Sequence, residues 1–435
     1  MASDNSGHVE RTTSASMPRA GSAMALLGAM VFVVSLGYGA GLPLIRPYLL
    51  RYLGAVPAST VAWHVGMLGG VYLFALFLFA PLWGRLSDRH GRVLVLLIGF
   101  AAFLIGSAAM ALAPSLEVVY GARVLAGAGA AAIVPTAQAY TADFSTTVDR
   151  SRRFVLLGSA SFIGFLAGPA FGTWLAGPVM GVTVGQMGSM LNWPAMAVAL
   201  SGLPLLLLAP WCLGWNRVAA LPIAVKPNAS RRRFLRSSML LALLASFAVG
   251  TFEVGFNLFG SQTLGLTTTA MAAMFITCSL AMLAAQSLLL FSSVRNRIDQ
   301  RWMAAAFAGA AIALAFTSLA PDAGSLGLMI AVVATAAGMI GPVLSYELLE
   351  RQSAAPGTLL GQQAAAGNLG QALGSMGAGS LFTLAPMAPF WTAALVLLVG
   401  AVLALLWWGP ARLGEIAAGK LPNTDTDAKR LTGHL

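Results

Sequence analysis

Long apolar runs recur along almost the whole of this 435-residue sequence, and only short polar links separate them. Runs of about 18 or more residues with few charges are long enough to cross a bilayer as helices. Only 9% of the residues are charged, whereas soluble domains average about 25%. The runs are unbroken rather than alternating, which argues against membrane strands. The chain is therefore predicted to be an all-α integral membrane protein.

Twelve of these runs are predicted to be membrane-spanning helices, since each offers about 20 apolar residues. The first six cover residues 24–45, 64–84, 94–113, 116–140, 154–177 and 191–211. The last six cover residues 237–260, 269–292, 302–320, 325–346, 362–385 and 389–408. The polar ends, residues 1–23 and 409–435, are predicted to be tails.

The basic residues fall on one side of this arrangement. With both termini in the cytoplasm, every Lys and Arg except Arg46, Arg51 and Arg123 lies in a cytoplasmic link or tail. Such an excess is typical of cytoplasmic loops, so the pattern predicts that both ends of the chain are cytoplasmic. The net charge of +11 then matches an anionic membrane surface rather than nucleic acid. The expected location is the inner, or plasma, membrane of the cell.

The longest link, residues 212–236, is basic and lies near the middle of the chain. It separates a six-helix half at 24–211 from a second six-helix half at 237–408. The charged link at 84–92 has a degraded counterpart at 292–302, at the matching position of the second half. Two repeats around a central pathway are typical of secondary transporters.

The link between the second and third spans reads GRLSDRHGR and resembles the loop signature of the major facilitator superfamily. The resemblance extends to the twelve-helix plan of nearly the full chain. It implies a latch between the two halves on the cytoplasmic side, in which Asp88 meets the start of the eleventh span and Arg92 pairs with Asp143. The alternative is that these charges only set the orientation. The gating residues implied are Gly84, Asp88, Arg89, Gly91, Arg92 and Asp143.

The fifth span contains GFLAGPAFG, which resembles the antiporter motif of the drug-exporting branches of this family. The matching positions are Gly164, Gly168, Pro169 and Gly172, and Thr173 replaces a final glycine. Small residues four apart let helices approach closely, and a proline bends a helix. The resemblance implies export in exchange for a cation, usually H⁺. The alternative is ordinary close packing between helices.

Charged side chains inside the spans mark candidate sites, because they are costly in a bilayer. Glu253 lies well inside the seventh span, with Asn257 on the same helix face. Burial favours the protonated form of a carboxylic acid, so Glu253 is a candidate for proton coupling. The alternative is a structural ion pair with Arg46, which is otherwise available to an anionic substrate. Arg123 either faces a cavity or snorkels to the outer interface.

The eleventh span carries a polar stripe that is suited to lining a pathway. Gln363, Gly367, Gln371 and Ser375 repeat there at steps of four residues, which places them on one helix face. With Arg46, Arg123, Glu253 and Asn257, the two glutamines complete the set of predicted coupling and substrate residues.

No Walker-type ATP sequence, nucleophile elbow or cluster of metal-ligating residues is visible in the sequence. We therefore expect a transporter rather than an enzyme, driven by the proton gradient, without cofactor or metal. The predicted function is efflux of a small molecule, drug-like or a secreted metabolite such as a siderophore, in exchange for protons. The expected partners are this substrate, protons and the bilayer, with the chain acting as a monomer. The alternatives are a proton-coupled uptake symporter and a transporter-like sensor.

Overall fold

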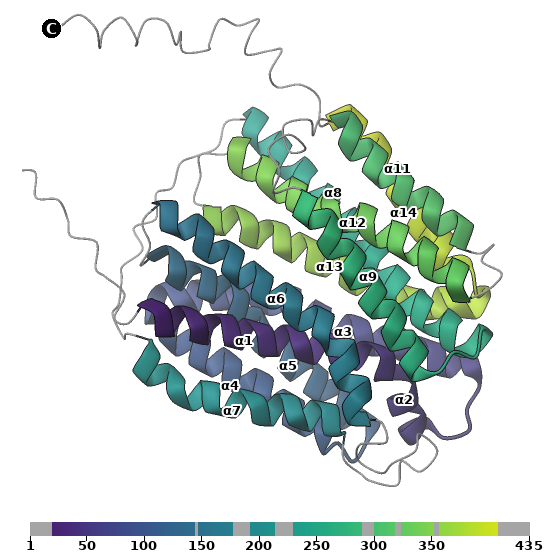
Figure 1. The fold of residues 1–435 in the computed structure, drawn as a ribbon, viewed down its shortest axis with the longest axis horizontal. Helices are drawn as coiled ribbons and strands as arrows, with labels where there is room; N and C mark the ends of the chain where they lie inside the picture. The colour runs from purple at the N-terminus through teal and green to yellow at the C-terminus, as the bar shows by residue number, and fades with distance from the viewer. Residues whose placement is uncertain are drawn as a thin grey trace, which may run out of the picture.

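The computed structural model describes residues 20–143, 147–176, 192–213, 229–288, 300–317, 323–351 and 356–407, and the regular elements in these ranges are all helical. The first half contains α1 (Ala20–Gly41), η1 (Leu42–Leu44), α2 (Ile45–Leu53), α3 (Ala58–His90), α4 (Arg92–Ala111), α5 (Leu116–Asp143), α6 (Thr147–Ala176) and α7 (Trp193–Cys212). The second half contains α8 (Ala229–Leu258), η3 (Phe259–Thr263), α9 (Thr268–Leu288), α11 (Gln300–Phe316), α12 (Ala323–Arg351), α13 (Pro356–Leu384) and α14 (Ala388–Trp407). Figure 1 shows these helices running side by side in one bundle.

The all-helical prediction is confirmed for the described residues, and ten helical segments among them are long and apolar enough to cross a membrane. The predicted spans at 302–320 and 362–385 fall on α11 and α13, which do not meet that standard. The apolar part of α11, Arg301–Phe316, is short. The sequence of α13 is rich in Gly, Gln and Ser, which lowers its hydropathy. Residues 1–19 and 408–435, the middle of the 212–236 link and most of the 292–302 link lie outside the described residues, and the last four residues of the predicted tail 1–23 belong to α1.

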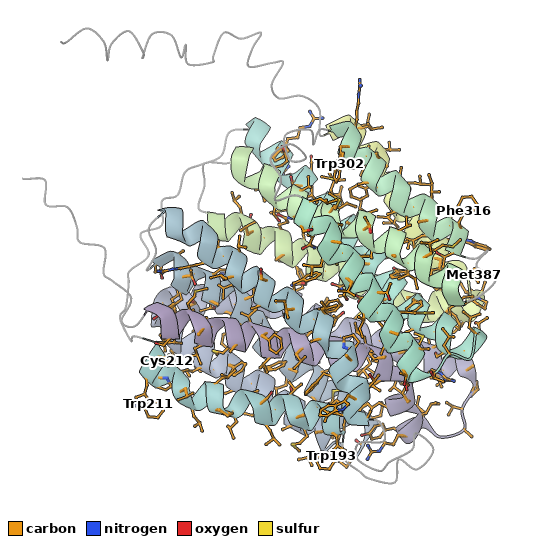
Figure 2. All side chains as sticks on the ribbon, in the orientation of Figure 1. Trp193, Trp211, Cys212, Trp302, Phe316 and Met387 are labelled. Atoms are coloured by element: carbon orange, nitrogen blue, oxygen red, sulfur yellow. The ribbon has the colours of Figure 1, made fainter. Side chains whose placement is uncertain are left out.

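The outward surface of the bundle is apolar, as a lipid solvent requires. Helix α7 exposes Leu200, Leu203 and Leu207, and α14 exposes a similar row of leucines. Figure 2 shows Trp193 and Trp211 at opposite ends of α7. Their spacing along the helix is about 27 Å at the usual rise per residue, close to the thickness of a hydrocarbon core. Tryptophans at both ends are typical of membrane–water interfaces.

The GRLSDRHGR stretch is mostly helix rather than loop, which differs from the predicted link. Helix α3 continues through it to His90, and α4 begins at Arg92. The whole connection is the single residue Gly91, whose φ of 96° lies in the left-handed region. Glycine adopts this conformation without steric cost, so Gly91 allows the abrupt turn. Helix α8 likewise begins at Ala229, inside the predicted link 212–236.

The first predicted span, 24–45, is interrupted. Helix α1 ends at Gly41, a 3₁₀ turn covers Leu42–Leu44, and α2 continues from Ile45 to Leu53. Pro43 lies in this turn and has no backbone N–H to donate, so the regular helix cannot continue unchanged. The break divides the first predicted span into two helices that meet at the Leu42–Leu44 turn.

Glycine seams hold the helix pairs α1–α6 and α8–α13 together. A Cβ atom added at Gly164 would lie 2.4 Å from the Phe32 carbonyl oxygen, and one at Gly168 would lie 2.6 Å from the Ala40 nitrogen. In the second half, added Cβ atoms at Gly370 and Gly374 would each lie 2.1 Å from a carbonyl oxygen of α8. Only glycine permits such close backbone contact. The two seams occupy equivalent places in the two halves, which supports the predicted internal repeat.

The two halves meet at the end of the bundle opposite to the Gly91 turn. We call this the closed end, and the end that holds Gly91 the turn end. At the closed end, Gly66 and Gly70 near the start of α3 pack on Ser375 and Met376 of α13. One hydrophobic core there contains residues from both halves, including Leu49 and Phe256. Among the buried residues that the structure describes, the core of the first half toward the turn end includes only Ala372 from the second half.

Candidate functional site

Three polar side chains from three helices meet at Glu253. The Tyr38 hydroxyl of α1 donates to Glu253 Oε2 at 3.0 Å, and Gln371 Nε2 of α13 donates to the same oxygen at 3.0 Å. Gln371 Nε2 also donates a hydrogen bond to the Tyr38 hydroxyl oxygen at 3.3 Å. Glu253 itself is 9% exposed. A buried carboxyl group thus connects the first half, through α1, with two helices of the second half.

Aromatic stacking holds the Tyr38 hydroxyl in place. Its ring stacks on Tyr72 of α3 and on Phe165 of α6, with centroid distances of 5.4 and 5.9 Å. Gly39, the next residue, allows this approach, because an added Cβ there would lie 2.6 Å from the Phe165 carbonyl oxygen. Pro169 removes the N–H that would normally bond this carbonyl. The predicted antiporter motif therefore shapes the packing behind Tyr38.

The ion pair between Arg46 and Glu253, one of the sequence-based alternatives, is not formed. The recorded partners of Glu253 in the described residues are Tyr38 and Gln371. Arg46 lies beyond the Leu42–Leu44 break, at the start of α2, and its Nε is buried without a hydrogen-bond partner there. The carboxyl group of Glu253 is therefore bonded by neutral donors and not neutralised by a cation.

Asn257 contacts the break in the first span. Its Nδ2 donates to the Leu42 carbonyl oxygen at 2.7 Å, and the side chain is buried. Leu42 is the first residue of the 3₁₀ turn that follows α1. Asn257 thus joins α8 to the end of α1, one turn beyond Glu253 and nearer the closed end. Asn257 lies one helical turn from Glu253, on the predicted polar face of α8. Its recorded hydrogen bond goes to a backbone carbonyl and not to Glu253.

Arg123 of α5 lies inside the first half and faces a small cavity. It is 6% exposed, and its guanidinium carbon lies 5.8 Å from the centre of the Tyr72 ring. Snorkelling to the interface, the second alternative for Arg123, is therefore wrong. The cavity measures about 50 Å³. Its lining includes Tyr38, Gly41, Tyr48, Tyr72, Ser107, Arg123 and Asn192.

Gln363 and Gln371 serve different places, although they share a helix face. Gln363 lies two turns before Gln371 and is buried, and its Nε2 donates to the Gly341 carbonyl oxygen of α12 at 3.4 Å. It therefore packs between α13 and α12 and has no recorded contact with the Glu253 cluster. The part of the polar stripe that reaches Glu253 is Gln371, with Ser375 bonded to the Gly250 carbonyl one turn later.

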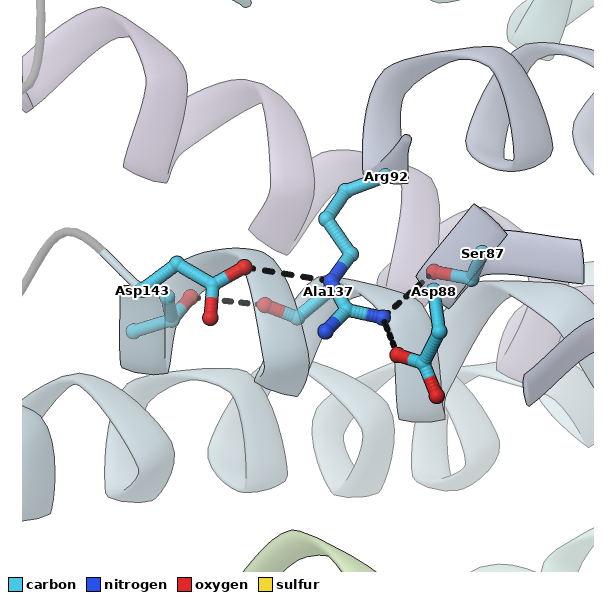
Figure 3. Close-up of polar contacts among 6 residues, drawn as sticks. Ser87, Asp88, Arg92, Ala137 and Asp143 are labelled. Atoms are coloured by element: carbon cyan, nitrogen blue, oxygen red, sulfur yellow. Dashed lines mark hydrogen bonds and ion pairs between the residues drawn. The ribbon is translucent and has the colours of Figure 1, made fainter. Parts of the chain in front are cut away.

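At the turn end, Arg92 bridges two acids of the first half (Figure 3). Its Nε lies 3.1 Å from Asp143 Oδ2, so the predicted pair is present. Its Nη1 donates to Asp88 and, at 2.9 Å, to Ser87. Asp88 is 60% exposed, whereas Arg92 and Asp143 are largely buried. Arg92 thus ties the ends of α3 and α5 to the start of α4.

The predicted contact between Asp88 and the start of the eleventh span is not formed among the described residues. Asp88 pairs within its own half, with Arg92. Gly84 and Arg89 are exposed on α3, and an added Cβ at Gly84 would meet nothing within 4 Å. The recorded close contacts between α3 and α13 lie toward the closed end, at Gly66 and Gly70, and the side chains of residues 351–358 lie outside the described part of the chain.

Comparisons with known proteins agree with this geometry. A family model described as the Major Facilitator Superfamily matches residues 27–361. Multidrug resistance protein 2 of Bacillus subtilis is 25% identical over 386 residues, 87% of this chain and 93% of that protein. The class C tetracycline resistance protein of Escherichia coli is 36% identical over 192 residues, 43% of this chain and 44% of that protein.

Solved structures share the fold. A D-xylose-proton symporter superposes with a TM-score of 0.70 at 16% identity, covering 89% of this chain and 98% of that one. The human organic anion transporter MFSD10 (TETRAN) superposes with a TM-score of 0.63 at 22% identity, and the match covers 89% of this chain and 100% of that one.

Proposed function

This chain belongs to the Major Facilitator Superfamily, a family of transporters, and we propose that it exports a small molecule from the cell in exchange for protons. The observation that carries the proposal is the Glu253 cluster, a buried carboxyl group that bonds both halves at once. The antiporter motif of α6 and the multidrug and tetracycline resistance relatives support the export direction.

We also propose that the chain crosses the inner (plasma) membrane twelve times and that both of its termini lie in the cytoplasm. The distribution of Lys and Arg supports this orientation. The turn end then faces the cytoplasm and the closed end faces outward. The contacts between the halves at the closed end correspond to a carrier that is open toward the cytoplasm. The chain acts as a monomer and takes its energy from the proton gradient, without a cofactor.

Protonation of Glu253 would change the bonds between the halves. As a carboxylate, Glu253 accepts hydrogen bonds from Tyr38 and Gln371, which hold α1 against α8 and α13. As a neutral acid, it is a weaker acceptor, because charge-assisted hydrogen bonds are roughly twice as strong as neutral ones. Protonation of Glu253 therefore loosens a contact between the halves. This supplies the difference between two states that exchange of substrate for protons needs.

The Asp88–Arg92–Asp143 cluster would serve as the cytoplasmic gate. In the present arrangement, Asp88 is exposed and bonded only within its own half. When the halves close at the turn end, the exposed carboxylate would meet the positive end of the α13 dipole. Arg92 would keep its ion pair with Asp143 in both states, because both of these side chains are largely buried.

Replacing Asp88 by Asn is expected to slow conformational cycling by at least tenfold while substrate affinity changes little. The substitution removes the charge that a helix N-terminus attracts and preserves the size of the side chain. Transport rates and substrate binding, measured on the same purified variant, separate the two effects. Arg85→Gln, which removes an exposed charge on the same helix, is the matched control. A loss of affinity at an unchanged turnover rate would contradict the gate role.

The substrate is proposed to be a drug-like compound or a secreted metabolite that carries an anionic group. Arg46 is a cation of the first half without an acidic partner among the described residues. Tyrosine rings beside Arg123 and Glu253 add flat apolar surface for an aromatic compound. The relatives named for tetracycline resistance make tetracycline a suitable first test substrate.

Everted membrane vesicles test the function directly. Their cytoplasmic face points outward, so an exporter moves tetracycline into the lumen while protons leave it. An acidic lumen is expected to drive accumulation, and an ionophore that collapses the gradient should abolish it. Accumulation driven instead by an alkaline lumen would indicate a symporter and contradict the proposal.

Comparing the metabolites secreted by a deletion strain and its parent extends the same test to natural substrates.

A further inference from the structure

The small cavity of the first half carries a positive charge that nothing in the described structure neutralises. Arg123 lines it, is 6% exposed, and has no recorded hydrogen bond; its Nε is buried without a partner. None of the residues that line the cavity is acidic. The two recorded ion pairs of the described residues both involve Arg92, at the turn end. Arg123 is therefore a buried cation without a counter-charge.

The tyrosines around Arg123 do not replace a counter-ion. Tyr72 offers its ring at 5.8 Å, which gives a modest cation–π attraction. The Tyr48 hydroxyl is already used, since it donates to the Met110 carbonyl. Ser107 is also used, as its hydroxyl donates to the Phe103 carbonyl oxygen at 2.9 Å. Removing an unpaired cation from water is costly, so these contacts leave most of the cost uncompensated.

We propose that this cavity binds a small monovalent anion between Arg123 and the Tyr72 hydroxyl. Arg123 offers its unpaired guanidinium N–H groups, and the Tyr72 hydroxyl has no recorded partner among the described residues. The volume limits the ligand. A cavity of about 50 Å³ holds an ion of chloride or formate size with little water, whereas drug-sized ligands occupy pockets of roughly 300–1,000 Å³.

The position of this site would couple the anion to the Glu253 cluster. Arg123 faces Tyr72, Tyr72 stacks on Tyr38, and Tyr38 donates to Glu253. A bound anion would fix the guanidinium and, through it, the stack that positions the Tyr38 hydroxyl. The anion is thus a resident ligand of the first half, distinct in size from the exported substrate. The inference rests on this geometry and not on the direction of transport.

Thermal unfolding of the purified full-length chain in detergent, followed by tryptophan fluorescence, tests the site. Sodium chloride, sodium formate and sodium gluconate are compared at equal ionic strength, because gluconate is too large for the cavity. A saturable rise of the midpoint with chloride or formate, absent with gluconate, is the expected result. A response to chloride identifies an inorganic-ion site, and a response to formate alone identifies a carboxylate site. Equal midpoints in all three salts would overturn the proposal.

Variants tie the effect to the cavity. Arg123→Gln should abolish the rise, and Arg123→Lys should keep it with at least tenfold weaker apparent affinity. Arg51→Gln is the matched control, since Arg51 lies at the same 5.8 Å from the Tyr52 ring but does not line the cavity. If Arg123→Gln fails to fold, Gly41→Ala decides. Its added Cβ would lie 2.9 Å from Arg123 Nη2 and narrow the site, so an unchanged chloride response would refute the proposal.

Discussion

Glu253→Gln is expected to reduce proton-driven accumulation in everted vesicles to background, at least tenfold below the wild type. Glutamine has nearly the same size and keeps an acceptor oxygen for Tyr38 and Gln371, so the fold should be preserved. It cannot bind or release a proton, and it lacks the charge that strengthens those two bonds. Exchange of labelled for unlabelled substrate needs no net proton movement, and should therefore continue. Measuring both reactions in the same vesicles separates coupling from transport.

The matched control is Glu117→Gln, which removes an exposed acid at the start of α5 and should leave accumulation unchanged. Tyr38→Phe removes one of the two donors to Glu253 but keeps the stacking ring. It should weaken coupling without abolishing it. Proton-driven accumulation that survives in Glu253→Gln at wild-type level would remove Glu253 from the coupling mechanism.

The sequence predicted the helices well because their apolar runs are long, and it misjudged the places where single residues control the backbone. The GRLSDRHGR stretch looks like a loop because it is charged, yet four of its charged or polar side chains are exposed on the last turns of α3, namely Arg85, Asp88, Arg89 and His90. Charged residues indicate that a segment contacts water, but they do not distinguish a loop from the exposed end of a helix. Gly91 was the useful signal, since its left-handed φ makes the turn.

The candidate site was predicted by residue type, but its pairings required the fold. Glu253 and Gln371 stand out as polar residues in apolar spans, whereas a tyrosine in a span is too ordinary to reveal that Tyr38 bonds Glu253. Helices far apart in sequence bring these side chains together, and no local pattern records such contacts. The alternative of an ion pair between Arg46 and Glu253 could not be decided from the sequence for the same reason, and the structure does not form it. The Leu42–Leu44 break turns Arg46 onto a separate helix, α2.

Gly168→Val in α6 is expected to reduce both stability and transport strongly, because the added atoms have no space. A Cβ at this position would lie 2.6 Å from the Ala40 nitrogen and 2.6 Å from the Gly39 carbonyl carbon. These are backbone atoms of α1, so only separation of the two helices relieves the clash. Overpacking of a core lowers the free energy of unfolding by about 1–3 kcal/mol. We expect a value at the upper end here, because the neighbouring atoms belong to the backbone of α1 and cannot move aside as a side chain can. The thermal midpoint and the vesicle transport rate measure the two effects.

Gly158→Val in the same helix provides the control, since an added Cβ there meets nothing within 4 Å. Gly370→Val in α13 tests the equivalent seam of the second half, where the Cβ would lie 2.1 Å from the Leu243 carbonyl oxygen. If the antiporter motif is only a packing device, both seam variants should lose transport in proportion to their loss of folded protein. If it also positions Tyr38, Gly168→Val should lose proton coupling beyond that proportion, because its seam lies directly behind the stacked Tyr38 ring. A Gly168→Val protein as stable and active as Gly158→Val would show that the close contact between α1 and α6 is not required.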